Sequence, residues 1–138
     1  MRTVDTIQVG ESASFTKTVT EADIVLYAGI TGDFNPAHID DVSAKESMFG
    51  ARIAHGMLSA GFISAVLGTK LPGPGAIYIS QELKFVKPVF AGDTITATAT
   101  VTEVDVERNR GTLDTTASNQ NGDAVIIGTA KLMPPKAR

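Results

Sequence analysis

The segment Ala54–Gly68 (AHGMLSAGFISAVLG) constrains the fold more than any other part of the chain. The spacing of its residues predicts a helix with apolar side chains on nearly all sides, and such a helix is normally buried. The sequence LPGPG follows and ends it. The most apolar stretch, Ile53 to Leu67, is shorter than the roughly 20 residues that a bilayer requires. It also contains His55, Ser59 and Ser64, so a core helix is predicted rather than a membrane span.

Consecutive strand patterns follow this helix. The predicted strands are Ala76–Val86, Asp93–Val106, Gly111–Asn119 and Ala124–Met133. The second of them contains DTITATATVTEV, which alternates between Thr and small apolar residues as a half-buried strand does. Asn121-Gly122 predicts a hairpin between the last two strands. One buried helix followed by strands indicates an α+β fold in which an antiparallel sheet wraps around the helix. A doubly wound fold would need alternating helices and strands.

The first part of the chain is predicted to begin with a strand at Ser12–Val19, followed by a helix. Thr20 and Asp23 form a capping pattern at the start of this helix, and Gly29 or Gly32 is expected near its end.

The next segment, Gly32–Asp40 (GDFNPAHID), is polar and contains Pro36, which predicts a loop. A short helix is expected after it, around Ser43–Met48. No linker or repeat divides the chain, so residues 1–138 are predicted to form one domain.

Composition excludes several kinds of site. The chain has no cysteine, which rules out disulfides, thiolate nucleophiles and Cys-ligated metals. Its two histidines argue against a multi-His metal site, so no metal is expected. The net charge of −3 provides no overall attraction to nucleic acid or to an anionic membrane. The N-terminus lacks the apolar run of a signal peptide, and a cytoplasmic protein is therefore expected.

Tyr27–His38 (YAGITGDFNPAH) carries a carboxylate and an imidazole on one predicted loop. Pro36 stiffens the turn, so the loop can direct Asp33, Asn35 and His38 into one small volume. A water molecule held between a carboxylate and an imidazole is what a hydration reaction needs, because one group takes its proton while the other orients it or supplies a proton to carbon. The same residues also suit a structural turn, since Asp, Asn and Pro are common in loops.

Gly56 lies at the start of the predicted buried helix. If that helix begins near Ala54, the Gly56 N–H lies in its first turn, where unpaired N–H groups and the helix dipole favour an oxyanion. A glycine there would let a carbonyl group approach the backbone closely. The alternative is a glycine required only for tight helix–sheet packing. His55 is expected to be structural, or to form a wall of the site.

YAGITGDFNPAHID resembles the signature of the MaoC-like R-specific enoyl-CoA hydratases, in which Tyr or Phe precedes a small-residue stretch and then G-D-x-N-P-x-H. The matching residues follow one another without a gap: Gly32, Asp33, Asn35, Pro36 and His38. The stretch from Arg52 to Val104 resembles the central helix and following strands of the same family. The resemblance therefore spans most of the chain and implies a hot-dog fold.

The resemblance implies reversible addition of water to trans-2-enoyl-CoA, giving (R)-3-hydroxyacyl-CoA, in a homodimer that uses no cofactor beyond the CoA of its substrate. Asp33 and His38 would be the catalytic pair. Asn35 would hold the loop and the water, and the Gly56 amide would polarise the thioester carbonyl. Some short members look to have a serine beside the substrate where this helix has Gly61, so acyl-chain fit does not carry over.

Two alternatives remain: a 3-hydroxyacyl-thioester dehydratase acting on acyl-carrier protein, and a non-catalytic acyl-CoA-binding hot-dog domain. Hot-dog thioesterases and carrier-protein dehydratases usually have Asp or Glu on the central helix, whereas no acidic residue lies between Glu46 and Glu82 here. A binding domain would need no Asp33/His38 pair. The candidates for binding the CoA phosphates are Arg52, Lys70, Lys84 and Lys87.

Overall fold

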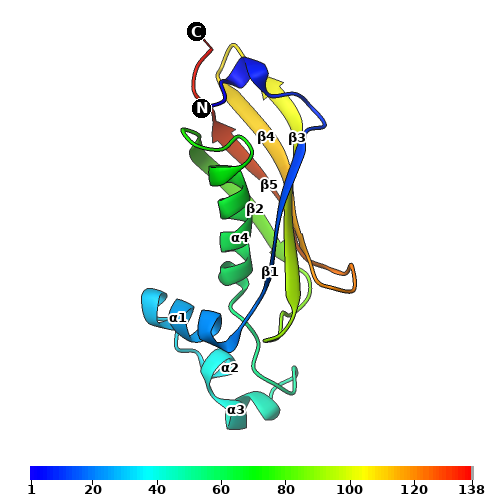
Figure 1. Cartoon of the computed structure of the whole chain (residues 1–138). Helices are drawn as coiled ribbons and strands as arrows, with labels where there is room; N and C mark the ends of the chain where they lie inside the picture. The colour runs from blue at the N-terminus through cyan, green and yellow to red at the C-terminus, as the bar shows by residue number, and fades with distance from the viewer. Residues whose placement is uncertain (138) are drawn as a thin grey trace.

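The computed structural model describes residues 1–137, in which a five-stranded antiparallel sheet curves around one long helix (Figure 1). The strand order is β1-β3-β4-β5-β2, so β1 and β2 are the edges of the sheet. The strands are β1 (Ser12–Thr18), β2 (Ile77–Phe85), β3 (Thr94–Asp105), β4 (Arg110–Ser118) and β5 (Ala124–Met133). The long helix is α4 (Gly56–Thr69). The predicted α+β class is confirmed.

Strand alternation placed the sheet correctly, with every predicted boundary within one residue of the observed one. In β3, alternate residues are fully buried and face the helix, which gives this half-buried strand its core side: Ile95, Ala97, Ala99 and Val101. The predicted hairpin joins β4 to β5, with Gly122 at a φ of 80° and its N–H donating to the carbonyl of Asn119 at 3.0 Å.

Helix α1 (Glu21–Thr31) begins and ends at predicted residues. The Thr20 hydroxyl accepts from the Asp23 N–H while the Asp23 carboxylate accepts from the Thr20 N–H, which completes the predicted capping box. Gly32 caps the other end in the left-handed conformation, with a φ of 84°.

Two predictions for the next segment need correction. The stretch Gly32–Asp40 is not all loop, because it contains the one-turn helix α2 (Pro36–Ile39). Proline suits the first position of a helix, where its missing N–H costs nothing. Helix α3 (Asp41–Lys45) starts earlier than the expected Ser43, because the side chain of Asp40 accepts two backbone N–H groups and starts the helix there. A short 3-10 helix (Val4–Thr6) lies before β1.

Helix α4 starts at Gly56 rather than near Ala54, because the Ala54 N–H donates to the Val89 carbonyl at 2.7 Å. Burial on all sides was also predicted, and it is wrong for the single chain. One face packs on the sheet, whereas the opposite face is exposed at Met57, Gly61, Ser64 and Gly68. The physical reason is that the sheet of one chain covers only one side of the helix (Figure 1). Within residues 1–137, no helix is long and apolar enough to span a membrane.

Candidate active site

The segment from Gly32 to Asn35 joins α1 to α2 through consecutive local hydrogen bonds. After the left-handed turn at Gly32, the Asp33 carboxylate accepts the N–H of Asn35 at 3.2 Å. The Asn35 side-chain oxygen then accepts the N–H of Ala37 at 3.0 Å and caps α2. Asn35 therefore ties the loop to the start of α2. The Asp33 side chain remains exposed to solvent.

His38 lies on α2, half-buried, and is fixed by the segment that precedes α4. Its Nδ1 lies 2.7 Å from the carbonyl oxygen of Ile53. Because a carbonyl oxygen only accepts, Nδ1 must carry the proton of this bond. In the neutral ring Nε2 then has a free lone pair, and it can accept a proton from a water molecule.

His55 connects α4 to the loop of Asp33. It is only 2% exposed, and its Nε2–H donates to the Asp33 carbonyl at 2.9 Å. Its ring stacks on that of His38, with centroids 3.8 Å apart and planes 29° apart. The ring of Tyr27 lies 4.6 Å away, tilted by 52°. The sequence predicted only that His55 is structural or forms a wall of the site. It did not predict these contacts.

One side-chain nitrogen or oxygen from each of Asp33, His38 and His55 lies within 4.8 Å of the other two. The structure thus brings the predicted carboxylate and imidazole together and adds a second imidazole. The two rings are close to parallel, so their in-plane lone pairs are not directed at one point. A shared metal ion would therefore require one ring to rotate, whereas a water molecule can bridge the Asp33 carboxylate and His38.

Gly56 is the first residue of α4, so its N–H cannot bond within the helix. No acceptor for it exists among residues 1–137. A side chain here would collide with another residue, because an added Cβ would lie 2.7 Å from the ring of Phe85. Gly56 borders a largely apolar cavity of about 550 Å³ whose walls include Met48, Phe49, Met57, Phe85 and Val89. This is the geometry expected of a helix N-terminus that accepts a carbonyl oxygen.

Comparison with known proteins identifies the family. Residues 5–122 match the model of the MaoC like domain. The chain belongs to the MaoC-like family. It is 56% identical to the (R)-specific enoyl-CoA hydratase of Rhodospirillum rubrum, over 94% of this chain and 89% of that protein. It is 47% identical to the 3-hydroxybutyryl-CoA dehydratase of Methylorubrum extorquens, over 94% of this chain and 82% of that protein.

Among solved structures, the R-hydratase PhaJ1 from Pseudomonas aeruginosa in its unliganded form superposes with a TM-score of 0.91 at 41% identity. The match covers 98% of this chain and 86% of that one. The hot-dog fold predicted from the sequence is therefore confirmed for this MaoC-like chain.

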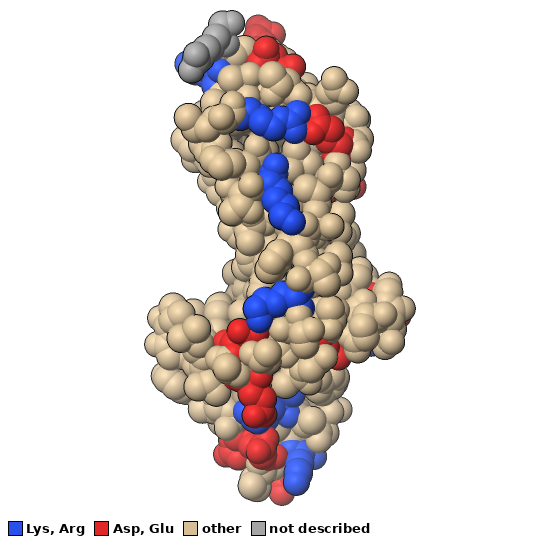
Figure 2. Space-filling view, in the orientation of Figure 1, with Lys and Arg blue, Asp and Glu red and all other residues tan. Residues whose placement is uncertain are grey.

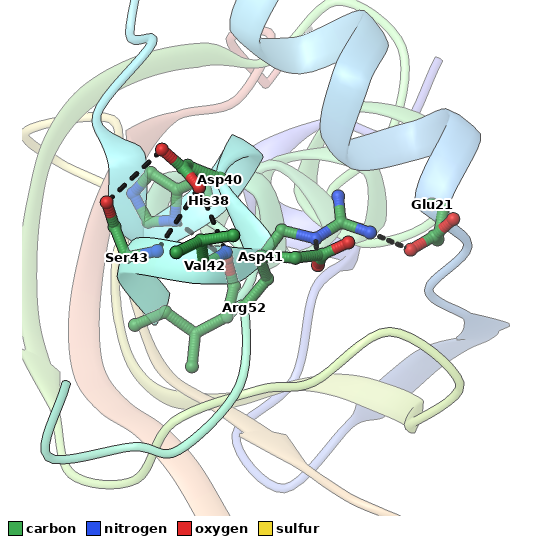
Figure 3. Close-up of polar contacts among 8 residues, drawn as sticks. Glu21, His38, Asp40, Asp41, Val42, Ser43 and Arg52 are labelled. Carbon is green, nitrogen blue, oxygen red and sulfur yellow. Dashed lines mark hydrogen bonds and ion pairs between the residues drawn. The ribbon is translucent and has the colours of Figure 1, made fainter. Parts of the chain in front are cut away.

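An ionic network braces the short helices of the MaoC-like site (Figure 3). Arg52, next to Ile53, pairs with Glu21 at the start of α1 and with Asp41 at the start of α3. The hydrogen bond and charge of Asp41 hold the pKa of Arg52 above its usual value. Hydrogen bonds from Ser43, and from the backbone of Val42, hold the pKa of Asp40 below its usual range. These contacts fix the segments that carry His38 and its partner Ile53.

Most of the proposed CoA-phosphate cations of this MaoC-like chain have partners within the fold. Arg52 belongs to the ionic network, Lys87 pairs with Asp123 at 2.6 Å, and Lys70 donates to the Ser14 carbonyl. Lys84, on β2, makes no ion pair with any of residues 1–137. Figure 2 shows basic side chains along the middle of one face and acidic ones near the end that carries α2 and α3.

Proposed function

We infer that this chain is an (R)-specific enoyl-CoA hydratase, which reversibly adds water to trans-2-enoyl-CoA and gives (R)-3-hydroxyacyl-CoA. The observation that carries this inference is the 56% identity to the Rhodospirillum rubrum hydratase over 94% of the chain. The clustering of Asp33 and His38 with His55, the residue directly before Gly56, supports it. We further propose that residues 1–138 act as one domain.

We propose that a water molecule sits between the Asp33 carboxylate and Nε2 of His38. His38 takes a proton from the water as the oxygen bonds to C3 of the enoyl group, while Asp33 orients the water and Asn35 holds the loop. The electron pair of the double bond moves towards the thioester carbonyl, where the N–H of Gly56 stabilises the developing negative charge. The Asp33–His38 pair then returns a proton to C2, so that H and OH are both added. Dehydration is the same sequence in reverse.

The stereochemistry of the product provides the test of function. Purified protein incubated with crotonyl-CoA should give (R)-3-hydroxybutyryl-CoA, and a chelator should leave the rate unchanged. Chiral analysis of the product identifies the enantiomer, and Asp33→Asn protein purified in the same way controls for contaminating hydratases. The S enantiomer, or loss of activity on chelation, would contradict the inference.

We also propose that the chain forms a homodimer through β2 and the exposed face of α4. The free edge of β2 carries exposed apolar side chains: Ile77, Tyr78, Ile79 and Phe85. The other edge strand, β1 (SASFTKT), is mostly polar. An exposed apolar edge strand is a template for pairing with another chain.

The exposed face of α4 lies beside this edge. Met57, Gly61 and Ser64 form one wall of a groove of about 470 Å³, and residues of β2 form the other. Small residues at Gly61 and Ser64 permit close approach of a second helix. A second copy of the chain fits both features, because two-fold symmetry would place β2 against β2 and α4 against α4.

A charged residue on this surface should disrupt the dimer. Ile79→Lys is expected to shift the protein from dimer to monomer, because Ile79 lies on β2 and also borders the groove. Sedimentation at micromolar concentration measures the change, and Val9→Lys, at another exposed apolar position, is the control that should remain dimeric. A wild-type protein that sediments only as a monomer would rule out the dimer.

A further inference from the structure

His55 contacts the site in several places, yet the proposed mechanism gives it no step. It is buried, donates to the Asp33 carbonyl, stacks on His38 and immediately precedes Gly56. We propose that His55 is a positioning residue, which fixes the water-binding pair relative to the carbonyl-binding amide. This proposal rests on the proposed function and assigns His55 no direct contact with substrate.

The hydrogen bond to Asp33 defines the state of the His55 ring. Because the Asp33 carbonyl only accepts, Nε2 must carry a proton. Nδ1 is buried and has no hydrogen-bond partner among residues 1–137. The ionisable side chains around the ring are Tyr27 from α1, His38 from α2 and Asp33 from their connection. His55 therefore acts on the Asp33 backbone as a hydrogen-bond donor through Nε2.

The two contacts of His55 restrain different parts of the site. Its Nε2–H holds the backbone of Asp33, and therefore the direction in which the carboxylate leaves the chain. Its ring face covers one side of the His38 ring, which is already fixed at Nδ1 by the Ile53 carbonyl. Together these contacts leave the His38 ring little freedom to turn relative to Asp33.

His55 also connects the two halves of the proposed reaction. The water lies at Asp33 and His38, whereas the thioester carbonyl lies at the N–H of Gly56, the next residue after His55. The distance between the water and C3 of the substrate therefore depends on this side chain. Displacing a reacting group by about 1 Å can cost on the order of 10²-fold in rate. Loss of His55 should consequently lower kcat more than it raises KM.

Three substitutions of His55 separate the contribution of its hydrogen bond from that of its stacked ring. In His55→Gln the amide nitrogen can take the place of Nε2 and keep the bond to Asp33. His55→Asn places its amide nitrogen near Nδ1 instead, and His55→Phe keeps the stacked ring without a donor. Measurements with crotonyl-CoA should show kcat lower by about 10–100-fold for Asn and Phe, and by less than about 10-fold for Gln. KM should stay within a few-fold of wild type in all three.

Unfolding in urea tells positioning apart from a purely structural role. His55→Phe removes a buried nitrogen that lacks a partner but also removes the hydrogen bond to Asp33, so the two effects oppose each other and its stability should stay close to that of the wild type while its turnover is impaired. Equal kcat for Phe and wild type would overturn the proposal, as would losses in kcat that simply follow losses in stability. Equal losses for Gln and Phe would overturn the role of the hydrogen bond.

Nitrogen NMR of the imidazoles tests His55 without depending on turnover. The wild-type protein should show His55 protonated at Nε2, and His55→Phe should change the signals of His38. If the wild type shows this proton but does not hydrate crotonyl-CoA, the proposed function fails while the arrangement of His55 stands. If it hydrates crotonyl-CoA but Nε2 of His55 carries no proton, the positioning role fails alone.

Discussion

Replacing Asp33 by Asn should lower kcat for crotonyl-CoA by about 10²–10⁴-fold, the usual contribution of a general acid or base. The substitution is close to isosteric, and the amide oxygen of Asn can still accept the N–H of Asn35, so the turn should persist. His38→Asn should have an effect of the same size. Its amide nitrogen can take the place of Nδ1 and keep the bond to Ile53, while the basic Nε2 is lost. Steady-state kinetics on the purified variants measures both.

The double variant tests whether the two residues act as a unit. If both act on the same water, as proposed, the double variant should fall little further than either single one. Circular dichroism should show all three variants folded, because Asp33 is exposed and His38 only half-buried. Folded single variants with nearly full activity would mean that the loop is structural, and the catalytic assignment would then be wrong.

Gly56→Val should lower kcat by about 10²–10³-fold, which is the usual cost of losing one oxyanion donor. The side chain would occupy the approach to the backbone N–H, and its Cβ would also collide with the Phe85 ring at 2.7 Å. The matched control is Gly29→Val, also on a helix, where an added Cβ meets no atom within 4 Å. Kinetics with crotonyl-CoA should show a large loss for Gly56→Val and little change for Gly29→Val.

The collision with Phe85 needs its own control, because displacement of that ring could itself impair turnover. In a Phe85→Leu background the ring is gone, and Gly56→Val should still be slow if the amide binds the carbonyl. Recovery of near-normal kcat in that background would assign the effect to packing. A folded Gly56→Val enzyme with near-normal kcat would place the carbonyl elsewhere.

The sheet was predictable from sequence because strand alternation is a local pattern. The alternation of Thr with small apolar residues in β3 specifies which face of the strand is buried, whichever element packs against that face. The start of α4 was less predictable, because Ala54 leaves the helix to donate to Val89, a residue far along the chain. The exposed face of α4 could not be predicted either. Apolar spacing indicates that a face is covered, but not whether the same chain or a second copy covers it.

In the candidate site, too, the locally encoded features could be predicted and those that depend on distant residues could not. Asp33, Asn35 and His38 lie within one short segment whose caps and turns are encoded locally, so their convergence could be expected. The contacts of His55 could not, because its hydrogen bond to Asp33 spans 22 residues and depends on how α4 meets α1 and α2. The only signal in the sequence was a histidine directly before a glycine at a predicted helix start. Helix α2 is not predictable from Pro36 alone, because proline is common in loops and is also favoured at the first position of a helix.

The helix-capping residues between Gly32 and Asp40 limit how this protein can vary or be redesigned. Each of these capping residues ends one helix or begins the next, so the length of the segment is part of the site. Inserting or deleting one residue would shift every later cap and turn His38 away from Asp33. Point changes at Phe34 and Ile39, whose side chains are exposed, meet no such constraint. A designer could therefore randomise the outward side of this segment freely while keeping its residue count fixed.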